Sequence, residues 1–200
     1  MSAPGSFDVL HALRLKGIVP LDAVAALLGS TSDDVSSIVK TLESDGLVRV
    51  RELPRLSGWT LTDAGRARHA DEIASQRSAE LVAQLTPLYE RFLELNGRVK
   101  TVSTTWQQLA PDDAAGRWDA VEELGELHDE ASAIVEAVAA IVPRFAPYPR
   151  RLAAAVEQLR AGDERFFTGV TVDSFHTVWF ECHEDLIQTL GLDRIAEGSF

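Results

Sequence analysis

The sequence predicts a mainly α-helical fold with one small β-element, arranged as an N-terminal domain at residues 1–75 and an all-α helical bundle at residues 76–200. Apolar residues recur at helical spacing along most of the chain, whereas the alternation typical of strands is confined to residues 47–62. Charge also divides the chain: residues 1–78 hold nine Lys and Arg against ten Asp and Glu, out of 19 and 31 in the whole sequence. Residues 79–200 therefore have a net charge of −11 and should repel nucleic acid.

The composition narrows the class of protein. A chain of 200 residues with 46% hydrophobic and 25% charged residues is typical of a globular protein, which excludes wholesale disorder. Cys182 is the single cysteine, so neither a disulfide framework nor a multi-cysteine zinc cluster can form. The N-terminus lacks a basic leader and an apolar signal core, and no apolar run approaches the roughly 18 residues that span a membrane. We therefore expect a cytoplasmic protein with no membrane association.

Three short helices are predicted at the start of the chain. The first lies within residues 7–16 and ends at Gly17, and the second follows Pro20. The third lies within residues 30–46 and ends at Gly46, and its first turn holds two aspartates, which the helix dipole favours. Its apolar residues recur on one face, as in an amphipathic helix. They are Val35, Ile38, Val39 and Leu42.

A β-hairpin is predicted directly after these helices. Residues 47–52 alternate as a strand does, residues 58–62 form a second short strand, and the loop between them contains Pro54. The order helix, short helix, turn, helix and two-stranded hairpin is typical of a winged helix-turn-helix.

The same stretch resembles a known family. Residues 7–75 resemble the winged-helix domain of MarR-type transcription regulators. VSSIVKTLESDGLVRV is similar to the recognition helix and first wing strand of that family, and WTLTDAGRARHADEI to its return strand and connecting helix. The LTDAGR turn is the most specific match. The resemblance implies a winged-helix fold, DNA-binding ancestry and a homodimer formed by the helices that flank the winged domain.

The residues that would contact double-stranded DNA follow from this arrangement. A recognition helix presents its exposed face to the major groove, and wing cations hold backbone phosphates. The candidates are Ser36, Ser37, Lys40 and Thr41 on the helix and Arg49, Arg51 and Arg55 on the wing, with Arg66 and Arg68 as further phosphate contacts. Acidic residues border the same helix, so a winged helix that docks on a protein remains the alternative; its arginines would then be solvated charges.

The remaining sequence is predicted to be helical. One helix runs from Asp63 to about Leu85, and a threonine followed by Pro87 is expected to open a new one. Gly97 interrupts the pattern, and the next helix ends near Pro111. The apolar stripe of these helices predicts a core or a dimer interface. It consists of Leu81, Leu85, Leu88, Phe92 and Leu95.

Residues 117–142 show the clearest helical pattern of the chain. Its carboxylates cover the face opposite the apolar stripe, so we interpret them as a solvated surface and not as catalytic acids. Three prolines then interrupt the chain, a further helix ends at Gly162, and residues 162–171 are expected to form a loop.

The segment at residues 172–191 carries two adjacent stripes on one broad apolar face, with His176 and His183 in the second stripe. Three interpretations stay open: imidazoles packed in a core, a pocket for a small organic effector, or a metal site completed by Asp173 or Glu184. The expected pocket residues are Trp106, His128, Phe175, His176, Trp179, Phe180 and His183. No cofactor and no resident metal is predicted.

Two further resemblances concern the bundle. Residues 92–194 are similar to a C-terminal region of uncharacterised actinobacterial winged-helix proteins, through Trp106-Gln107, RFAPYPRR and the 172–191 segment; no activity is implied. Asp173 and His176 resemble part of the metal-binding motif of GntR-type regulators. In that family the two residues lie one position further apart, and two more histidines follow.

The sequence contains no Gly-rich phosphate loop and no nucleophile elbow. Cys182 and His183 are consecutive helical residues, so their side chains diverge and cannot form a dyad. We therefore expect a DNA-binding transcription regulator and not an enzyme; the alternative is an accessory winged-helix module that docks on a partner protein.

Overall fold

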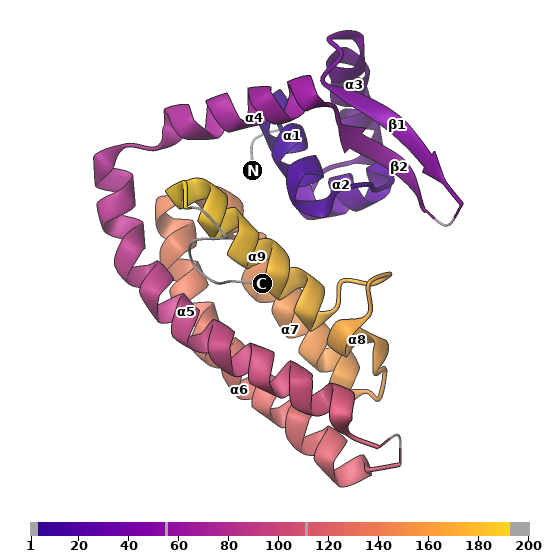
Figure 1. Ribbon diagram of the computed structural model, residues 1–200, viewed down its shortest axis with the longest axis vertical. Coiled ribbons are helices and arrows are strands. Elements are labelled where there is room, and N and C mark those ends of the chain that lie inside the picture. Colours follow the sequence, from indigo (N-terminus) through magenta and orange to yellow (C-terminus); the bar gives the residue numbers. More distant parts are fainter. Residues whose placement is uncertain (1–3, 55, 111, 193–200) are drawn as a thin grey trace. The chain divides into compact units, whose positions relative to one another are not determined.

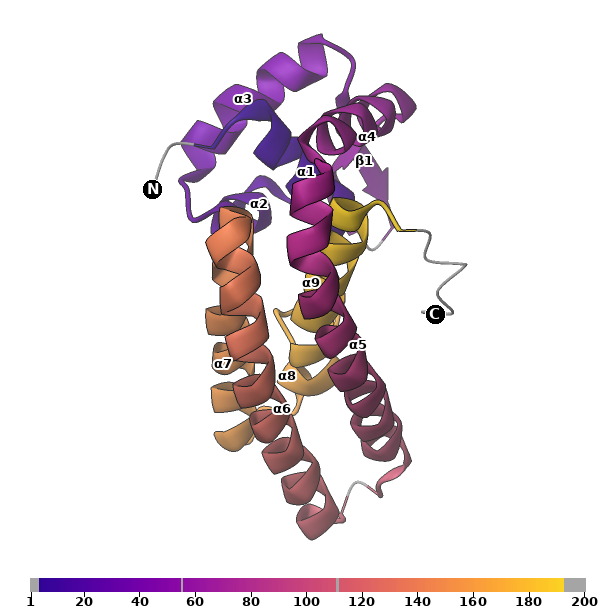
Figure 2. The same ribbon diagram turned by 90° about the vertical axis from the view of Figure 1, so that its left-hand side faces the viewer.

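The computed structural model describes residues 4–54, 56–110 and 112–192 (Figures 1 and 2). The chain divides into two compact units, residues 1–77 (unit 1) and residues 78–200 (unit 2). The described residues are mainly α-helical with one two-stranded antiparallel sheet, which confirms the predicted fold class. None of the helices that they form is long and apolar enough to cross a membrane.

Unit 1 is a winged helix-turn-helix. Its elements are α1 (Ser6–Lys16), α2 (Leu21–Leu28), α3 (Ser32–Ser44), β1 (Val48–Leu53), β2 (Leu56–Leu61) and α4 (Asp63–Gln76). The three short helices enclose an apolar core in which Leu10, Val24 and Val39 are buried. Two hydrogen bonds between Val19 and Trp59 attach the segment before α2 to the edge of the hairpin.

The junction between the wing and α4 explains the LTDAGR sequence physically. Thr62 caps α4 by accepting a hydrogen bond from the Gly65 amide at 3.0 Å, and it donates one to the Gly46 carbonyl at 2.7 Å. A Cβ atom on Gly65 would lie 1.9 Å from the carbonyl oxygen of Leu47, so α4 can approach the start of β1 this closely only without a side chain there. One threonine and one glycine thus hold α3, β1 and α4 together.

Unit 2 is an all-α bundle. Its elements are α5 (Ala79–Gln108), α6 (Ala114–Ile141), the 3₁₀ turn η1 (Pro143–Phe145), α7 (Pro147–Arg160), α8 (Arg165–Thr168) and α9 (Phe175–Leu190). The long helices α5 and α6 form an antiparallel hairpin, α7 packs on α6, and α9 packs on α7 and α5 (Figures 1 and 2). The core lies between these four helices and includes Phe92, Leu124, Leu152 and Leu186.

The predicted boundaries at the start of the bundle were wrong. The helix does not run from Asp63 to Leu85 but ends at Gln76, and Ser78 caps α5, accepting a hydrogen bond from the Leu81 amide at 3.0 Å. Helix α5 then continues through Pro87 and Gly97. Pro87 is exposed, and so is Ala83, whose carbonyl loses its usual donor and can bond to water instead.

Packing on the opposite side keeps α5 continuous. Leu85, Tyr89 and Phe92 flank the proline and are buried in the bundle core. The predicted apolar stripe is therefore core within one chain. A homodimer stays a prediction.

The expected loop after α7 contains a short helix, α8. Phe167 in α8 is buried, and its ring stacks on Trp106 of α5 with centroids 4.1 Å apart. The guanidinium of Arg117 covers the same indole at 4.6 Å. This tertiary contact orders a segment whose local sequence indicates only turns.

Candidate functional site

The candidate nucleic-acid interface lies on α3 and the wing of unit 1. Ser37, Lys40 and Thr41 are exposed on α3, whereas Ser36 is half-buried. The Ser37 hydroxyl donates to the Asp33 carbonyl at 3.1 Å, and the Thr41 hydroxyl donates to the Ser37 carbonyl at 3.4 Å. Both hydroxyl oxygens still have lone pairs, so in this geometry they can accept hydrogen bonds from the amino groups of bases.

The wing contributes two exposed cations. Arg49 and Arg51 lie two residues apart in β1, opposite Thr60 and Gly58, so both side chains leave the same face of the hairpin. Among the residues that the structure describes, the side chains of these arginines and of Lys40 have no ion-pair or hydrogen-bond partner. Arg55, the third predicted wing cation, lies outside the described residues.

Two other residues that were predicted to contact phosphate, Arg66 and Arg68, form ion pairs within unit 1. Arg66 binds the Asp63 carboxylate and donates to the Leu61 carbonyl at 3.1 Å, and Arg68 binds Glu72. The two exposed ion pairs join residues within α4, and the hydrogen bond to Leu61 joins α4 to the end of β2. Their guanidinium groups would have to exchange partners to bind phosphate.

One of the two acidic residues in the first turn of α3, Asp34, has a structural role. The Thr31 hydroxyl donates to the Asp34 carboxylate at 2.6 Å, and the Ser30 hydroxyl donates to it at 3.3 Å. These hydrogen bonds, chiefly the one from Thr31, lower the pKa of Asp34. Asp33, by contrast, is exposed near the tip of the helix and would face an approaching duplex with a negative charge.

The second candidate site is a pocket of about 330 Å³ between α5 and α9 in unit 2. It brings together four of the seven predicted pocket residues. These are His176, Trp179, Phe180 and His183. Helix α5 supplies the opposite wall with Asn96, Val99, Lys100, Ser103, Thr104 and Gln107.

Buried contacts fix the floor of this pocket. The Trp179 indole donates a hydrogen bond from Nε1 to Oδ1 of Asn96 at 2.9 Å, and its ring stacks on Phe92 at 4.6 Å. Nε2 of His183 lies 3.3 Å from the Tyr89 hydroxyl. Each aromatic ring is therefore held by a partner on α5, which gives the pocket a preformed wall.

The rim of the pocket differs from the sequence prediction. His176 and Phe180 are exposed, although they were expected on a buried face with His183. They stack on each other with centroids 6.2 Å apart. Helices α5 and α7 cover the sides of α9 that carry Phe175 and Cys182, whereas the flank with His176 and Phe180 remains at the surface. Partial burial still lowers the pKa of His176, because it disfavours the imidazolium form.

Three predicted pocket residues lie elsewhere. Phe175 is buried behind Trp179, with the two ring centroids 5.8 Å apart, and Trp106 stacks on Phe167 in the core. His128 does not reach the other two imidazoles. Periodicity placed these side chains on apolar faces, but it did not indicate which neighbouring helix each face contacts.

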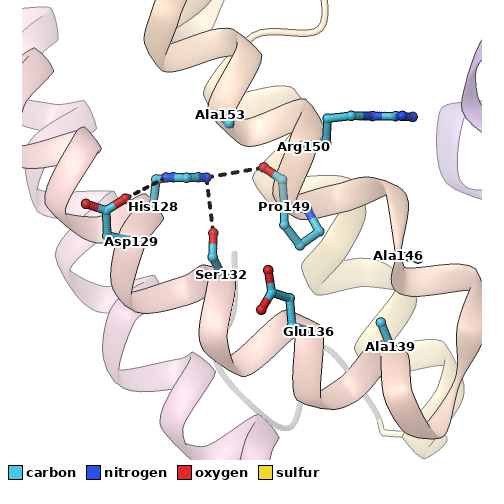
Figure 3. Close-up of a pocket in the computed structure, with 9 residues that line it drawn as sticks. All are labelled: His128, Asp129, Ser132, Glu136, Ala139, Ala146, Pro149, Arg150 and Ala153. Carbon is cyan, nitrogen blue, oxygen red and sulfur yellow. Dashed lines mark hydrogen bonds and ion pairs between the residues drawn. The ribbon is translucent and has the colours of Figure 1, made fainter.

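His128 instead lines a second, shallow hollow of about 590 Å³ between α6 and α7 (Figure 3). Its Nδ1 lies 3.1 Å from the Asp129 carboxylate, and its Nε2 lies 3.1 Å from the Ser132 hydroxyl and 3.2 Å from the Pro149 carbonyl oxygen. The order of groups is that of a Ser–His–Asp triad. A carbonyl oxygen only accepts hydrogen bonds, so Nε2 must carry the proton to bond Pro149 and cannot then take one from Ser132. In this geometry His128 links α6 to α7.

The acidic residues near α9 are engaged by arginines. Arg151 donates to the Asp173 carboxylate at 2.9 Å and to the buried Glu181 carboxylate at 2.7 Å. Burial alone would lower the pKa of Arg151, but these two carboxylates raise it.

Within the described residues, no group of three or more His, Cys, Asp or Glu side chains is placed to hold a metal ion. Cys182 is buried, and burial raises the pKa of its thiol.

No family model, curated protein or solved structure matches this chain.

Sequence reasoning missed the α5 wall of the pocket. Its polar residues Asn96, Lys100 and Gln107 recur at helical spacing, and Lys100 and Gln107 lie beside the apolar stripe. Asn96 is itself buried, at a position where the stripe would predict an apolar residue. A polar residue within a core stripe was therefore the signal that pointed to this wall.

Proposed function

We propose that this protein is a DNA-binding transcription regulator of the MarR-like winged-helix type, acting as a homodimer. The observation that carries the proposal is the group of exposed cations Lys40, Arg49 and Arg51. They lie on the two elements that a winged helix applies to DNA, and within the described part of the chain no carboxylate neutralises them.

The small number of exposed cations predicts a modest affinity for DNA that decreases as the salt concentration rises. Each phosphate that a cation neutralises releases condensed counterions, so three contacts per protomer predict a slope of log K against log salt concentration of about −3. A homodimer that uses both copies would approach about −5. The large acidic excess of unit 2 makes non-specific binding weak, so recognition depends on this local patch.

The proposal is tested by titrating the full chain with duplex DNA, its own upstream region and a random duplex, across a series of salt concentrations. Binding should weaken steeply with salt. Arg51→Gln should lower the affinity uniformly across sequences and reduce the salt slope by about one for each protomer bound, or about two for a homodimer that uses both copies.

Arg91→Gln is the matched control, because Arg91 is an exposed residue of α5 and the substitution changes the net charge equally. It should leave binding unchanged. Absence of any association at millimolar salt, or equal effects of the two variants, would contradict the proposal.

Docking on a protein is the second candidate. Exposed acidic residues border α3 at both ends, with Asp33 in its first turn and Glu43 and Asp45 near its last. They favour a basic protein surface over a phosphate backbone. This alternative would be supported if the chain did not bind DNA in the titration but co-purified with a protein, and if the Asp33→Asn variant no longer retained that protein.

A further inference from the structure

The pocket between α5 and α9 differs in charge from the unit that contains it. Unit 2 is strongly acidic, with 21 Asp and Glu against ten Lys and Arg beyond residue 78. Yet Lys100 and two histidines line this pocket, and none of its described lining residues is a carboxylate. A positively biased hollow in an acidic bundle is the reverse of what the composition predicts.

We propose that this pocket binds a small organic monoanion with a flat apolar body, its carboxylate at Lys100 and its body against Phe180 and Trp179. Every residue in the proposal belongs to unit 2. The inference therefore does not depend on whether unit 1 binds DNA.

The anion preference follows from the α5 wall. Lys100 is exposed and has no ion-pair partner among the residues that the structure describes, although carboxylates dominate the unit. The Gln107 side chain and the Ser103 hydroxyl lie on the same wall and can donate hydrogen bonds to a carboxylate. With one permanent cation in the lining, a monoanion is neutralised and a dianion is not.

The flat apolar body follows from the α9 wall. Phe180 is 45% exposed, which is unusual for a large apolar side chain, and its ring stacks on His176. Covering Phe180 with an apolar ligand removes that surface from water. The volume of about 330 Å³ lies at the small end of ligand pockets, so a molecule of one or two rings is the appropriate size.

Preorganisation lowers the entropic cost of binding. Trp179 is fixed by its hydrogen bond to Asn96, and His183 by its contact with Tyr89. The ligand has to order only the rim, where Lys100, His176 and Phe180 are exposed.

The proposal is tested on the full chain with benzoate and 2-naphthoate as probes, and with benzamide and acetate as analogues that lack the charge or the rings. Isothermal titration should show saturable binding of both aromatic carboxylates, and the melting temperature should rise with their concentration. Benzamide and acetate should bind at least about tenfold more weakly, because each lacks one of the two contacts.

Variants locate the site. Lys100→Gln should weaken 2-naphthoate binding about tenfold, and Phe180→Ala about fivefold. Both residues are exposed, so the variants should melt like the parent without ligand. Arg91→Gln removes one exposed positive charge from the same helix outside the pocket and should bind as the parent does. No saturable binding of either aromatic carboxylate, or equal affinities of the Lys100→Gln and Arg91→Gln variants, would overturn the proposal.

Discussion

In unit 2 most arginines bind carboxylates that are distant in sequence, whereas Lys40 of α3 and Arg49 and Arg51 of β1 in unit 1 form no ion pair among the described residues. The pairs of unit 2 are Arg98–Glu130, Arg117–Glu164, Arg144–Asp185, Arg151–Glu181 and Arg160–Glu122. An acidic bundle thus uses its few positive charges to join its helices. In the nearly neutral winged helix, by contrast, Lys40, Arg49 and Arg51 stay exposed.

Each unit also contains cations that differ from this pattern. Lys100 is a cation of the acidic bundle without such a pair among the described residues, and it lies in a pocket. Arg66 and Arg68 of the winged helix bind the neighbouring carboxylates of Asp63 and Glu72 on α4. A paired cation thus has a structural role, whereas an unpaired one is available to a ligand only where a pocket or surface site surrounds it.

The largest expected effect is the loss of a buried pair in unit 2. The Asp185 carboxylate is 2% exposed and is bound by Arg144 at 3.0 Å and by the Tyr148 hydroxyl at 3.2 Å. Arg144→Met leaves this buried charge without its cation and should cost about 3–5 kcal/mol of unfolding free energy. Chemical denaturation measures it, and the double variant with Asp185→Asn should recover part of the loss.

Arg98→Met is the control, because the Arg98–Glu130 pair is about half exposed on both sides. Its removal should cost about 0–1 kcal/mol. If both single variants were equally stable, the structural role assigned to the buried arginines of unit 2 would be wrong.

A smaller effect contrasts one glycine from each unit. Gly65→Ala places a methyl group where the Leu47 carbonyl oxygen lies and should destabilise unit 1 by about 1–3 kcal/mol. Gly97 lies inside α5, and a Cβ atom added to it would meet nothing within 4 Å, so Gly97→Ala should stabilise unit 2 by about 0.5–1 kcal/mol. Thermal unfolding of the two variants should show shifts of opposite sign, and a shift of the same sign in both would contradict the close packing at the wing junction.

The smallest effect concerns pH. Partial burial lowers the pKa of His176 in the folded state, so the unfolded chain binds this proton more readily. The folded state should therefore lose stability as pH falls from 7 toward 5. His176→Gln should show a shallower decrease in melting temperature over that range, and identical pH profiles of parent and variant would exclude this contribution.

Much of unit 1 could be predicted from the sequence, since its first three helices end at or beside glycines and its strands alternate within a short stretch. Unit 2 was less predictable. Pro87 indicates a helix start, but buried neighbours on both sides of it carry α5 through. Trp106, His128 and Phe175 have the residue types of a ligand pocket, yet they contact three different neighbours. The α5 wall, with Lys100, was not foreseen at all.

The sequence by itself determined the fold class, the separation of a nearly neutral winged helix from an acidic bundle, and most of the residues that the amphipathic helices turn inward. Those features depend on local periodicity, chain stiffness and net charge, which neighbours in sequence already specify. Only the tertiary structure decided which cations are paired, which histidine meets which helix, and where a pocket stays open. Those outcomes depend on contacts between residues tens of positions apart, such as Trp179 with Asn96, whose geometry exists only once the helices have packed.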